Sequence, residues 1–446
     1  MKRSIFSFVV LMVVAMMLLA ACAPAATPTP APANVEPTQA PVQATEAPTE
    51  APKEAVTLRM LVRPDEGNNV ADYAAKFEQE TGIKVAVDFV SWADISNKTL
   101  TTLAAGGGGY DIVFMPSADA PKLAVGGWFE PINDMMPDSE RANWLESVVN
   151  FYTFNGDLLA MPWYSGGAHM AYNKDVLAAA GVDPATILTW ADFMNACKAI
   201  KETKAAEFCF SPSAKHPGDF YYNSGTMIFS QGGQFFDADG APVFQNGTAA
   251  LDTFTMIADG VANGYFDKAG AAMDDYETLI EFGTGKTAFL LDSTWAATQA
   301  NRNKDLSTIV GKVGYILVPG TAEVRSNAFL YAGGLGILKT SEHKEEAKQY
   351  LAFQTSEAAQ KDHAINGSNM PSRVALFIDA DIISAWPGFA ELAAQLGYGD
   401  FVPAVPWLDE FRTSEATAVQ EVMAGTKTPE EAVQWLVTEA DRIRKQ

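Results

Sequence analysis

Three short motifs in the sequence resemble parts of catalytic sites, but each lacks a residue that its chemistry requires. Gly285-Lys286-Thr287 has the ending of a phosphate-binding loop, yet Ile280 stands where the first glycine belongs. Trp163 likewise replaces the first glycine of a GxSxG nucleophile turn around Ser165. The four histidines, at positions 169, 216, 343 and 363, lack the spacing of a zinc hydrolase. The sequence therefore predicts no catalytic residue, no metal site, no cofactor and no enzymatic reaction.

Aromatic and acidic side chains at the ends of predicted strands indicate a site that binds a molecule without transforming it. Trp92 and Asp119 each lie just after a predicted strand. A flat ring can stack on an apolar surface of a ligand, and a carboxylate accepts hydrogen bonds from its hydroxyl groups. Such a combination suits a small polar molecule in a partly apolar pocket.

The elements that position these residues alternate between strands and helices. Residues 56–62 and 83–89 have the two-residue period of strands, and residues 111–115 form a third apolar run. Between the first two, Val70, Tyr73, Ala74 and Phe77 recur at helical spacing before Gly82. This order predicts a mainly parallel α/β sheet with ligands beyond the carboxyl ends of its strands. Further strands are predicted at 158–164, 170–174, 287–291, 313–318 and 334–339.

Composition limits the class of partner. The chain has 446 residues, 48% of them hydrophobic, and a formal net charge of -23 from 31 Lys and Arg against 54 Asp and Glu. A chain this long and this apolar can build two or three domains. Its negative charge repels nucleic acid, which we therefore do not expect as a partner.

The N-terminal residues have the pattern of an export signal. Lys2 and Arg3 precede the apolar stretch 5–20, and Leu19-Ala20-Ala21-Cys22 resembles the bacterial lipobox. The alternative is an ordinary signal peptide with an incidental cysteine. We predict a signal peptide over 1–21, an acylated Cys22, and a Pro/Ala/Thr-rich tether over 22–55. The protein is then extracytoplasmic and lipid-anchored to the cell membrane, at the cell surface or the periplasmic face.

The order of several segments resembles the extracellular solute-binding proteins of bacterial ABC transporters, the group that includes the maltodextrin-binding proteins. The segments are spread over nearly all of residues 56–446, and they are 77–89, 98–115, 123–135, 158–182, 188–200, 282–296, 333–356 and 369–374. The loops that would form the cleft depart from the maltodextrin-binding pattern, so the resemblance does not specify the ligand.

This resemblance implies a two-lobed periplasmic-binding-protein fold, with two α/β domains joined by hinge strands and the ligand cleft between them. Lobe I is expected over 56–163 and 294–340, and lobe II over 164–293 and 341–446. Tyr164, Ser293 and Ser341 would lie at the hinge crossings. The implied function is that of a monomeric receptor that captures a sugar or oligosaccharide by hinge closure and delivers it to the permease of an ABC importer.

Eight residues are expected to contact the ligand of such a receptor because they lie at strand ends, crossings or loops near the cleft. They are Trp92, Asp119, Trp163, Tyr164, Tyr222, Trp295, Arg373 and Trp407. Each of the tryptophans has core packing as its alternative, and Arg373 has pairing with a surface acid. Cys197 and Cys209, twelve residues apart, form either a disulfide or two free thiols.

Two other kinds of function stay open at this point. The first is binding of another small polar solute, such as a polyamine or glycerol phosphate. Two or more tryptophans in the cleft favour a sugar, whereas clustered acids with one aromatic ring favour a polyamine. The second is a cell-surface glycan-processing enzyme, which requires two carboxyl groups about 5 to 10 Å apart.

Overall fold

The computed structural model describes residues 56–63, 69–237, 239–401, 405 and 407–445, apart from the side chains of residues 92 and 93. The predicted signal peptide, the acylated Cys22 and the tether lie outside the described residues. All elements below belong to one compact unit of the chain, residues 54–446. No helix among the described residues is both long enough and apolar enough to cross a bilayer.

The first lobe is an α/β layer built on three parallel strands. β1 (Thr57–Val62) pairs in parallel with β2 (Lys84–Phe89) and β3 (Ile112–Pro116), as the alternating pattern predicts. α2 (Val70–Thr81) buries Val70, Tyr73, Ala74 and Phe77 and ends at Gly82, whose φ of 74° suits a glycine. The other elements of this lobe are α3 (Trp92–Ala104), α4 (Ala120–Val125), η1 (Asn133–Met135), α5 (Asp138–Arg141), α6 (Glu146–Phe151), β4 (Thr153–Phe154) and β5 (Asp157–Leu158).

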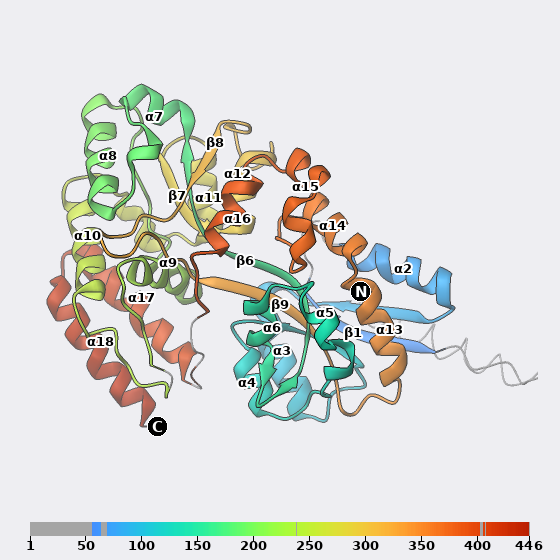
Figure 1. Ribbon diagram of the computed structural model, residues 1–446. Coiled ribbons are helices and arrows are strands. Elements are labelled where there is room, and N and C mark those ends of the chain that lie inside the picture. The colour runs from blue at the N-terminus through green and yellow to red at the C-terminus, as the bar shows by residue number, and fades with distance from the viewer. Residues whose placement is uncertain (1–55, 64–68, 238, 402–404, 406, 446) are drawn as a thin grey trace, which may run out of the picture. The chain divides into compact units, whose positions relative to one another are not determined.

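Two long strands run from the first lobe into the second (Figure 1). β6 (Met161–Asn173) and β9 (Leu330–Ile337) pair with each other in antiparallel fashion, and β9 also pairs antiparallel with β3. The sheet is therefore parallel only among its first three strands. The sequence predicts two short strands where β6 is one, because residues 165–169 lack an apolar alternation. Pairing with β9 and then with β7 (Phe289–Ser293) keeps that stretch extended.

The second lobe continues the same sheet and covers it on both faces. β7 (Phe289–Ser293) and β8 (Val313–Ile316) both pair antiparallel with β6. Phe289 and Leu291 of β7 face one hydrophobic cluster, whereas Leu290 between them faces another. The helices of this lobe are α7 (Lys174–Ala180), η2 (Pro184–Thr186), α8 (Trp190–Thr203), α9 (Pro217–Ser230), α10 (Ala249–Ala262), η3 (Lys268–Ala272), α11 (Asp275–Gly283), α12 (Thr294–Arg302), α15 (Ala380–Ala385), α16 (Phe389–Leu396), α17 (Leu408–Ala424) and α18 (Pro429–Arg444).

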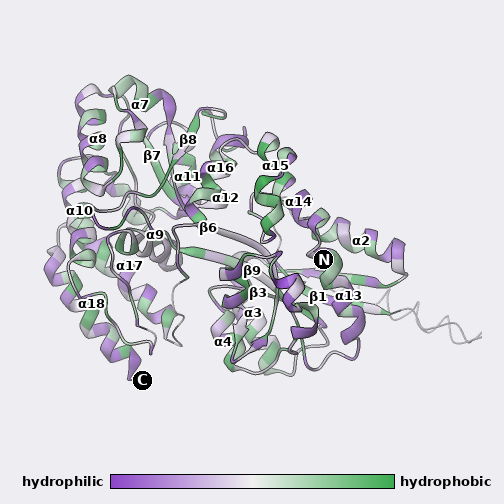
Figure 2. Cartoon of the chain, in the orientation of Figure 1, coloured by the Kyte–Doolittle hydropathy of each residue, from purple (hydrophilic) through white to green (hydrophobic). Residues whose placement is uncertain are grey.

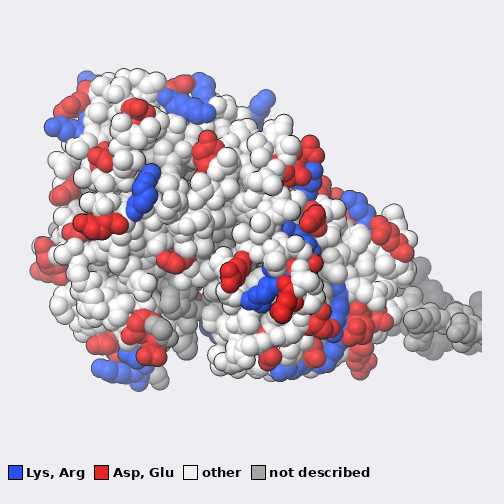
Figure 3. Space-filling view, viewed as in Figure 1, with Lys and Arg blue, Asp and Glu red and all other residues white. Residues whose placement is uncertain are grey.

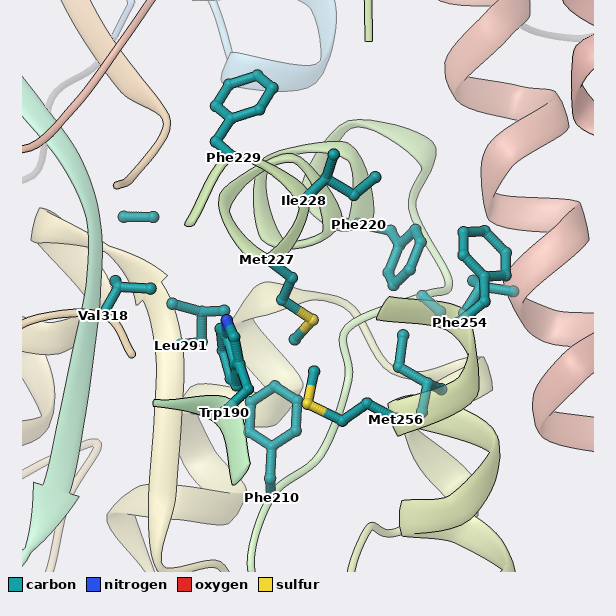
Figure 4. Packing of buried hydrophobic residues seen from close by; sticks show 14 of the residues in the cluster. Trp190, Phe210, Phe220, Met227, Ile228, Phe229, Phe254, Met256, Leu291 and Val318 are labelled. Carbon is teal, nitrogen blue, oxygen red and sulfur yellow. The ribbon is translucent and has the colours of Figure 1, made fainter. Parts of the chain in front are cut away.

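The larger cluster of the second lobe is rich in aromatic side chains. Figure 4 shows Trp190 of α8 beside Phe210 and Met227, with Leu291 of β7 nearby. Trp190 also donates a hydrogen bond from Nε1 to Ser230 Oγ over 2.9 Å, which satisfies its one polar atom. Thr189 and Asp192 form a capping box, so α8 begins where the sequence places its N-cap.

The hydrophobic clusters divide the chain differently from the predicted lobe boundaries, which stay a prediction. The first cluster contains residues of β1, β2, β3, the first half of β6, β9 and α13 (Lys344–Gln354). α12 and β8 belong instead to the cluster around Leu290, because β8 pairs with the second half of β6. Residues 294–316 thus pack with the second lobe, and residues 344–354 with the first.

The expected hinge positions Ser293 and Ser341 also differ from the crossings that the structure shows. Ser293 accepts a hydrogen bond from Ala296 N as the N-cap of α12, inside the second lobe. Ser341 Oγ donates to Asp111 Oδ1 over 2.6 Å, inside the first lobe. The crossings are made by β6, which contains Tyr164, by β9, and by the chain between α14 (Glu357–Asn366) and η4 (Val374–Ile378).

The surface of the described unit is polar and mixed in charge. Apolar residues concentrate on the strands and on the inward faces of the helices (Figure 2). In Figure 3 the basic side chains of the visible face are interspersed among acidic ones. This face offers no uniformly basic surface to a polyanion, in line with the charge balance of the sequence.

Candidate functional site

A cavity of about 410 Å³ lies at the carboxyl ends of β1, β2 and β3, the edge at which the sequence predicts a ligand. This volume is within the usual range for small-molecule sites. Both lobes and both crossing strands contribute to the lining, which consists of Arg63, Ser91, Pro116, Ser117, Tyr164, Ala168, Asp219, Tyr222, Asn223, Asp275, Tyr276, Asp292, Ser293, Trp295, Tyr331, Ala332 and Asn369. A molecule held here touches both lobes at once.

Two tyrosines of the cavity lie over glycines of the crossing strands. Tyr164 of β6 is paired with Gly333 of β9, and Tyr331 of β9 is paired with Gly166 of β6. A Cβ atom added at Gly333 would lie 2.3 Å from the Tyr164 ring, and one added at Gly166 would lie 2.3 Å from the Tyr331 ring. The glycines therefore give both rings room to lie flat against the crossing strands.

Three of the residues expected to contact a ligand line this cavity. They are Tyr164 of β6, Tyr222 of α9 and Trp295 in the first turn of α12. Tyr222 packs against Phe329 with 4.3 Å between ring centres. Arg63, at the end of β1, places its guanidinium carbon 5.4 Å from the centre of the Tyr164 ring. Ring faces from three elements thus meet in one cavity.

The structure places four of the other expected residues away from the cavity lining. Trp163 is 1% exposed and packs against Phe114 in the first cluster, at the irregularity in the pairing of β6 between Pro162 and Tyr164. Asp119 is buried beside Ser96, from which it accepts a hydrogen bond. Arg373 forms an ion pair with Glu140 over 3.0 Å, the alternative that the sequence left open. Trp407 packs on Phe236 with 4.8 Å between ring centres.

Trp92 is the remaining expected contact, and its side chain lies outside the described residues. Its backbone forms the first residue of α3, next to Ser91, which lines the cavity. The assignment of Trp92 to the ligand site stays a prediction.

Three carboxyl groups gather on the second-lobe wall of the cavity. Asp219 lies in the first turn of α9, Asp275 is the first residue of α11, and Asp292 is the penultimate residue of β7. Asp219 Oδ2 accepts a hydrogen bond from the backbone N–H of Asp275 over 3.2 Å. Asp292 Oδ1 accepts one from the backbone N–H of Ser293 over 2.5 Å.

The environment of these carboxyl groups disfavours their ionised form. Burial, followed by the charge of Asp275, raises the pKa of Asp219 to about 7. Burial likewise raises the pKa of Asp275, and the pKa of Asp292 lies well above its usual range for the same reason, with a further contribution from Asp275. Each ionised carboxyl of this wall makes ionisation of its neighbours harder.

Several lining residues were not singled out from the sequence. Asp292 directly follows the apolar run Thr287–Leu291, so the strand-end argument that selected Asp119 also applies to it. Asp275 and Tyr276 open a helix, and Tyr331 begins an apolar stretch. No pattern in the sequence identifies Asp275, Tyr276 or Tyr331 as a ligand contact, because their place in the cavity depends on long-range packing.

The catalytic-looking motifs have structural partners. Lys286, from the apparent phosphate loop, forms ion pairs with Asp267 and Glu281 over 2.7 and 2.5 Å. His169 is buried on β6 at 2.9 Å from Thr294 Oγ1, and burial lowers its pKa to about 3. Within the described ranges, no group of three His, Cys, Asp or Glu side chains is arranged to hold a metal ion.

A disulfide joins Cys197 of α8 to Cys209. Both half-cystines are buried in the larger cluster of the second lobe, at 0% and 2% exposure. The bond ties α8 to the chain segment that accompanies β7, and it lies apart from the cavity lining.

Comparison with known proteins identifies the family. The family model of bacterial extracellular solute-binding proteins matches residues 63–361, which include both crossing strands and most of the cavity lining. The chain belongs to this family. The resemblance inferred from the sequence is thereby confirmed, and membership of an extracellular family agrees with the expected extracytoplasmic location.

Two similar proteins of other bacteria are solute-binding proteins by name. The diacetylchitobiose binding protein DasA of Streptomyces coelicolor is 26% identical over 343 residues, which are 75% of this chain and 76% of that protein. The arabinooligosaccharide-binding protein of Halalkalibacterium halodurans is 27% identical over 286 residues, 61% and 60% of the two chains. By their names these relatives are binding proteins, which agrees with the absence of a catalytic motif from the sequence.

Solved structures establish the fold of this solute-binding protein. Maltose-bound MalE3 of T. maritima superposes with a TM-score of 0.76 at 23% identity, covering 87% of this chain and all of that one. A solute-binding protein of Agrobacterium vitis with bound D-mannitol superposes with a TM-score of 0.73 at 24% identity, covering 88% of this chain and 99% of that one. The predicted two-lobed periplasmic-binding-protein fold is therefore confirmed.

Proposed function

We propose that this solute-binding protein is the receptor of an ABC importer and captures a sugar or a short oligosaccharide between its two lobes. The observation that supports this most directly is the cavity lined by Tyr164, Tyr222, Tyr276, Trp295 and Tyr331 from both lobes and the crossing strands. Sugar rings have apolar C–H faces that stack on aromatic rings, and hydroxyl groups that bind to carboxylates and amides.

The same lining argues against glycerol phosphate as the solute. A phosphate requires basic side chains or free backbone N–H groups, and the three carboxyl groups of the second-lobe wall offer neither. A polyamine can bind to the carboxyl groups, but it has no flat ring on which the aromatic side chains of the cavity could stack. A sugar uses both kinds of side chain.

The proposal extends to how the receptor works in the cell. The lobes close over the solute because it contacts both of them, and the closed form is what the permease binds. The protein acts as a monomer, performs no reaction on the sugar, and is held to the outer face of the membrane by an acylated Cys22 and the tether over residues 22–55.

Thermal unfolding of the intact protein tests the function. A panel of monosaccharides, oligosaccharides, polyols and polyamines is added, and the unfolding is followed by tryptophan fluorescence. A solute at 100 times its Kd raises the free energy of unfolding by about 2.7 kcal/mol, which moves the Tm of a chain of this length by about 3 °C. The bound sugar is then recovered and weighed by mass spectrometry.

A Tm shift with one class of sugar, recovered intact, is the expected result. Shifts with polyamines or phosphates and with no sugar would contradict the sugar assignment. Recovery of the sugar in fragments would contradict the receptor role and support the glycan-processing alternative, in which two of the cavity carboxyl groups act as acid and base.

A further inference from the structure

The carboxyl groups that line the cavity outnumber the basic side chains that line it. Asp219, Asp275 and Asp292 all face the cavity, and Arg63 is the lining residue of opposite charge. Among the described residues, no lysine or arginine forms an ion pair with any of these three aspartates. His216 Nδ1 lies 3.5 Å from Asp219 Oδ1, but the histidine side chain is 62% exposed. In the part of the chain that the structure describes, the second-lobe wall is therefore a concentration of carboxyl groups without a paired lysine or arginine that would stabilise their ionised form.

Asp292 provides an independent indication that this wall binds a hydrogen-bond donor. The residue is 5% exposed, and its Oδ2 atom is buried without a hydrogen-bond partner, although Oδ1 has one. A buried acceptor without a partner destabilises the fold, by about 1–3 kcal/mol in typical cases. Because Asp292 lines the cavity, a ligand that brings a donor to Oδ2 would supply the missing partner.

We propose that the solute is an amine-bearing sugar, whose protonated amino group binds among Asp219, Asp275 and Asp292 while its ring stacks on the aromatic side chains of the cavity. This inference rests on the proposed sugar-receptor function and narrows it to one substrate class. An ammonium group has three donors and a positive charge, so it can bind to Asp292 Oδ2 and at the same time offset the mutual repulsion of the carboxyl groups.

A neutral hydroxyl group and a metal ion are the alternative partners for these carboxyl groups, and both fit the structure less well than an organic cation. A neutral hydroxyl group donates one hydrogen bond to Oδ2 but leaves the repulsion among the three carboxyl groups unchanged. A metal ion needs several ligands at short range, and the described residues contain no group arranged to hold one. An organic cation is large enough to reach carboxyl groups that come from α9, α11 and β7.

Matched sugars test this inference directly. Cellobiose, chitobiose and diacetylchitobiose share one β-1,4 disaccharide skeleton and carry a hydroxyl, a free amine and an acetamide at carbon 2. Glucose, glucosamine and N-acetylglucosamine form the corresponding monosaccharide series. Isothermal titration calorimetry of the intact protein at pH 6.5 measures the Kd of each sugar, with spermidine as a non-sugar amine. We expect the free amine of a series to bind at least tenfold more tightly than both of its neutral counterparts.

Substitutions then locate the amine. Asp292→Asn keeps the size of the side chain and removes its charge, and we expect it to reduce the amine preference, measured as a ratio of Kd values, at least fivefold. Asp219→Asn serves as a second variant from a different element. Asp175→Asn changes the net charge equally at an exposed residue that pairs with Lys312, and should leave the ratio unchanged. Circular dichroism verifies that each variant is folded.

The possible outcomes separate this inference from the receptor function. Neutral sugars that bind as tightly as their amines would overturn the amine preference and leave the receptor function in place. Binding of spermidine without any sugar would overturn the sugar function and retain a cation site. If none of the probes binds, the amine preference is overturned, and the wider panel of the thermal unfolding experiment decides the receptor function.

Discussion

At the scale of single residues, the cavity carboxyl groups couple binding to pH. In the folded protein the pKa of Asp219 is raised to about 7, whereas an unfolded chain has an ordinary aspartate there. Between pH 4 and pH 7 the folded state therefore binds more protons than the unfolded state, and the free energy of unfolding falls as pH rises. The charged groups that face Asp219 are Asp274 and Asp275 of the α11 region, Asp292 of β7, Lys215, His216, and Arg63 across the cavity.

We predict that Asp219→Asn removes this part of the pH dependence. Relative to the parent protein without ligand, the variant should gain on the order of 2–4 kcal/mol between pH 4 and pH 7, because the amide has no proton to lose. Urea denaturation at several pH values measures the difference, and Asp175→Asn controls for net charge. A difference between variant and parent that stays constant over this range would contradict the assigned pKa shift.

The affinity for an amine-bearing sugar should rise with pH, whereas the free energy of unfolding of the protein without ligand falls. Glucosamine or chitobiose requires ionised carboxyl groups, so its affinity should rise as pH increases from 5 to 7 while the amine stays protonated. Neutral sugars of the same series should show little change. Calorimetry at matched ionic strength makes the comparison, and a steeper pH dependence for cellobiose than for chitobiose would count against the carboxyl wall as the amine site.

At the scale of elements, the sequence predicts much of the first lobe and little of the cavity. The alternating pattern of residues 56–62 and the helical period from Val70 to Phe77 are local, and the corresponding elements form as expected. The capping residues Thr189 and Asp192 are local as well. By contrast, Tyr164 and Gly333 meet across β6 and β9, which are far apart in the chain, and no period in the sequence records that pairing. Trp163 was expected in the cavity because it lies at the first crossing, but it packs in the core where the pairing of β6 is irregular, and the sequence does not show that irregularity.

The glycines of the crossing strands give a prediction at this scale. A methyl group at Gly166 would lie 2.3 Å from the Tyr331 ring, so Gly166→Ala must displace that ring or separate the strands. We expect a loss of about 1–3 kcal/mol in stability and at least a tenfold weaker sugar affinity. Gly397→Ala is the matched control, since its new Cβ would meet only Ala394 O at an ordinary 3.4 Å. Equal effects of the two substitutions on affinity would show that the position of Tyr331 is unimportant.

At the scale of the whole molecule, binding depends on contacts that join the two lobes. Beyond the cavity, Lys122 of α4 and Asp409 of α17 form an ion pair over 3.0 Å, with α4 packed in the first lobe and α17 in the second. The side chains are 34% and 67% exposed. Such a pair stabilises only arrangements in which the lobes are this close, so under the proposed hinge closure we expect it to favour the closed form by its own small free energy.

Asp409→Asn should therefore weaken sugar binding slightly without changing the cavity. Exposed ion pairs contribute about 0–1 kcal/mol, so we expect a Kd increase of no more than about fivefold, and the increase should vanish as salt is raised. Asp175→Asn breaks the Lys312 pair at an exposed site within one lobe and should leave the Kd unchanged at every salt concentration. Because Asp409 does not line the cavity, the selectivity between amine and neutral sugars should stay constant in the variant. A change in that selectivity would mean that α17 acts on the carboxyl wall itself, whereas an unchanged Kd at low salt would show that the lobes close without this pair.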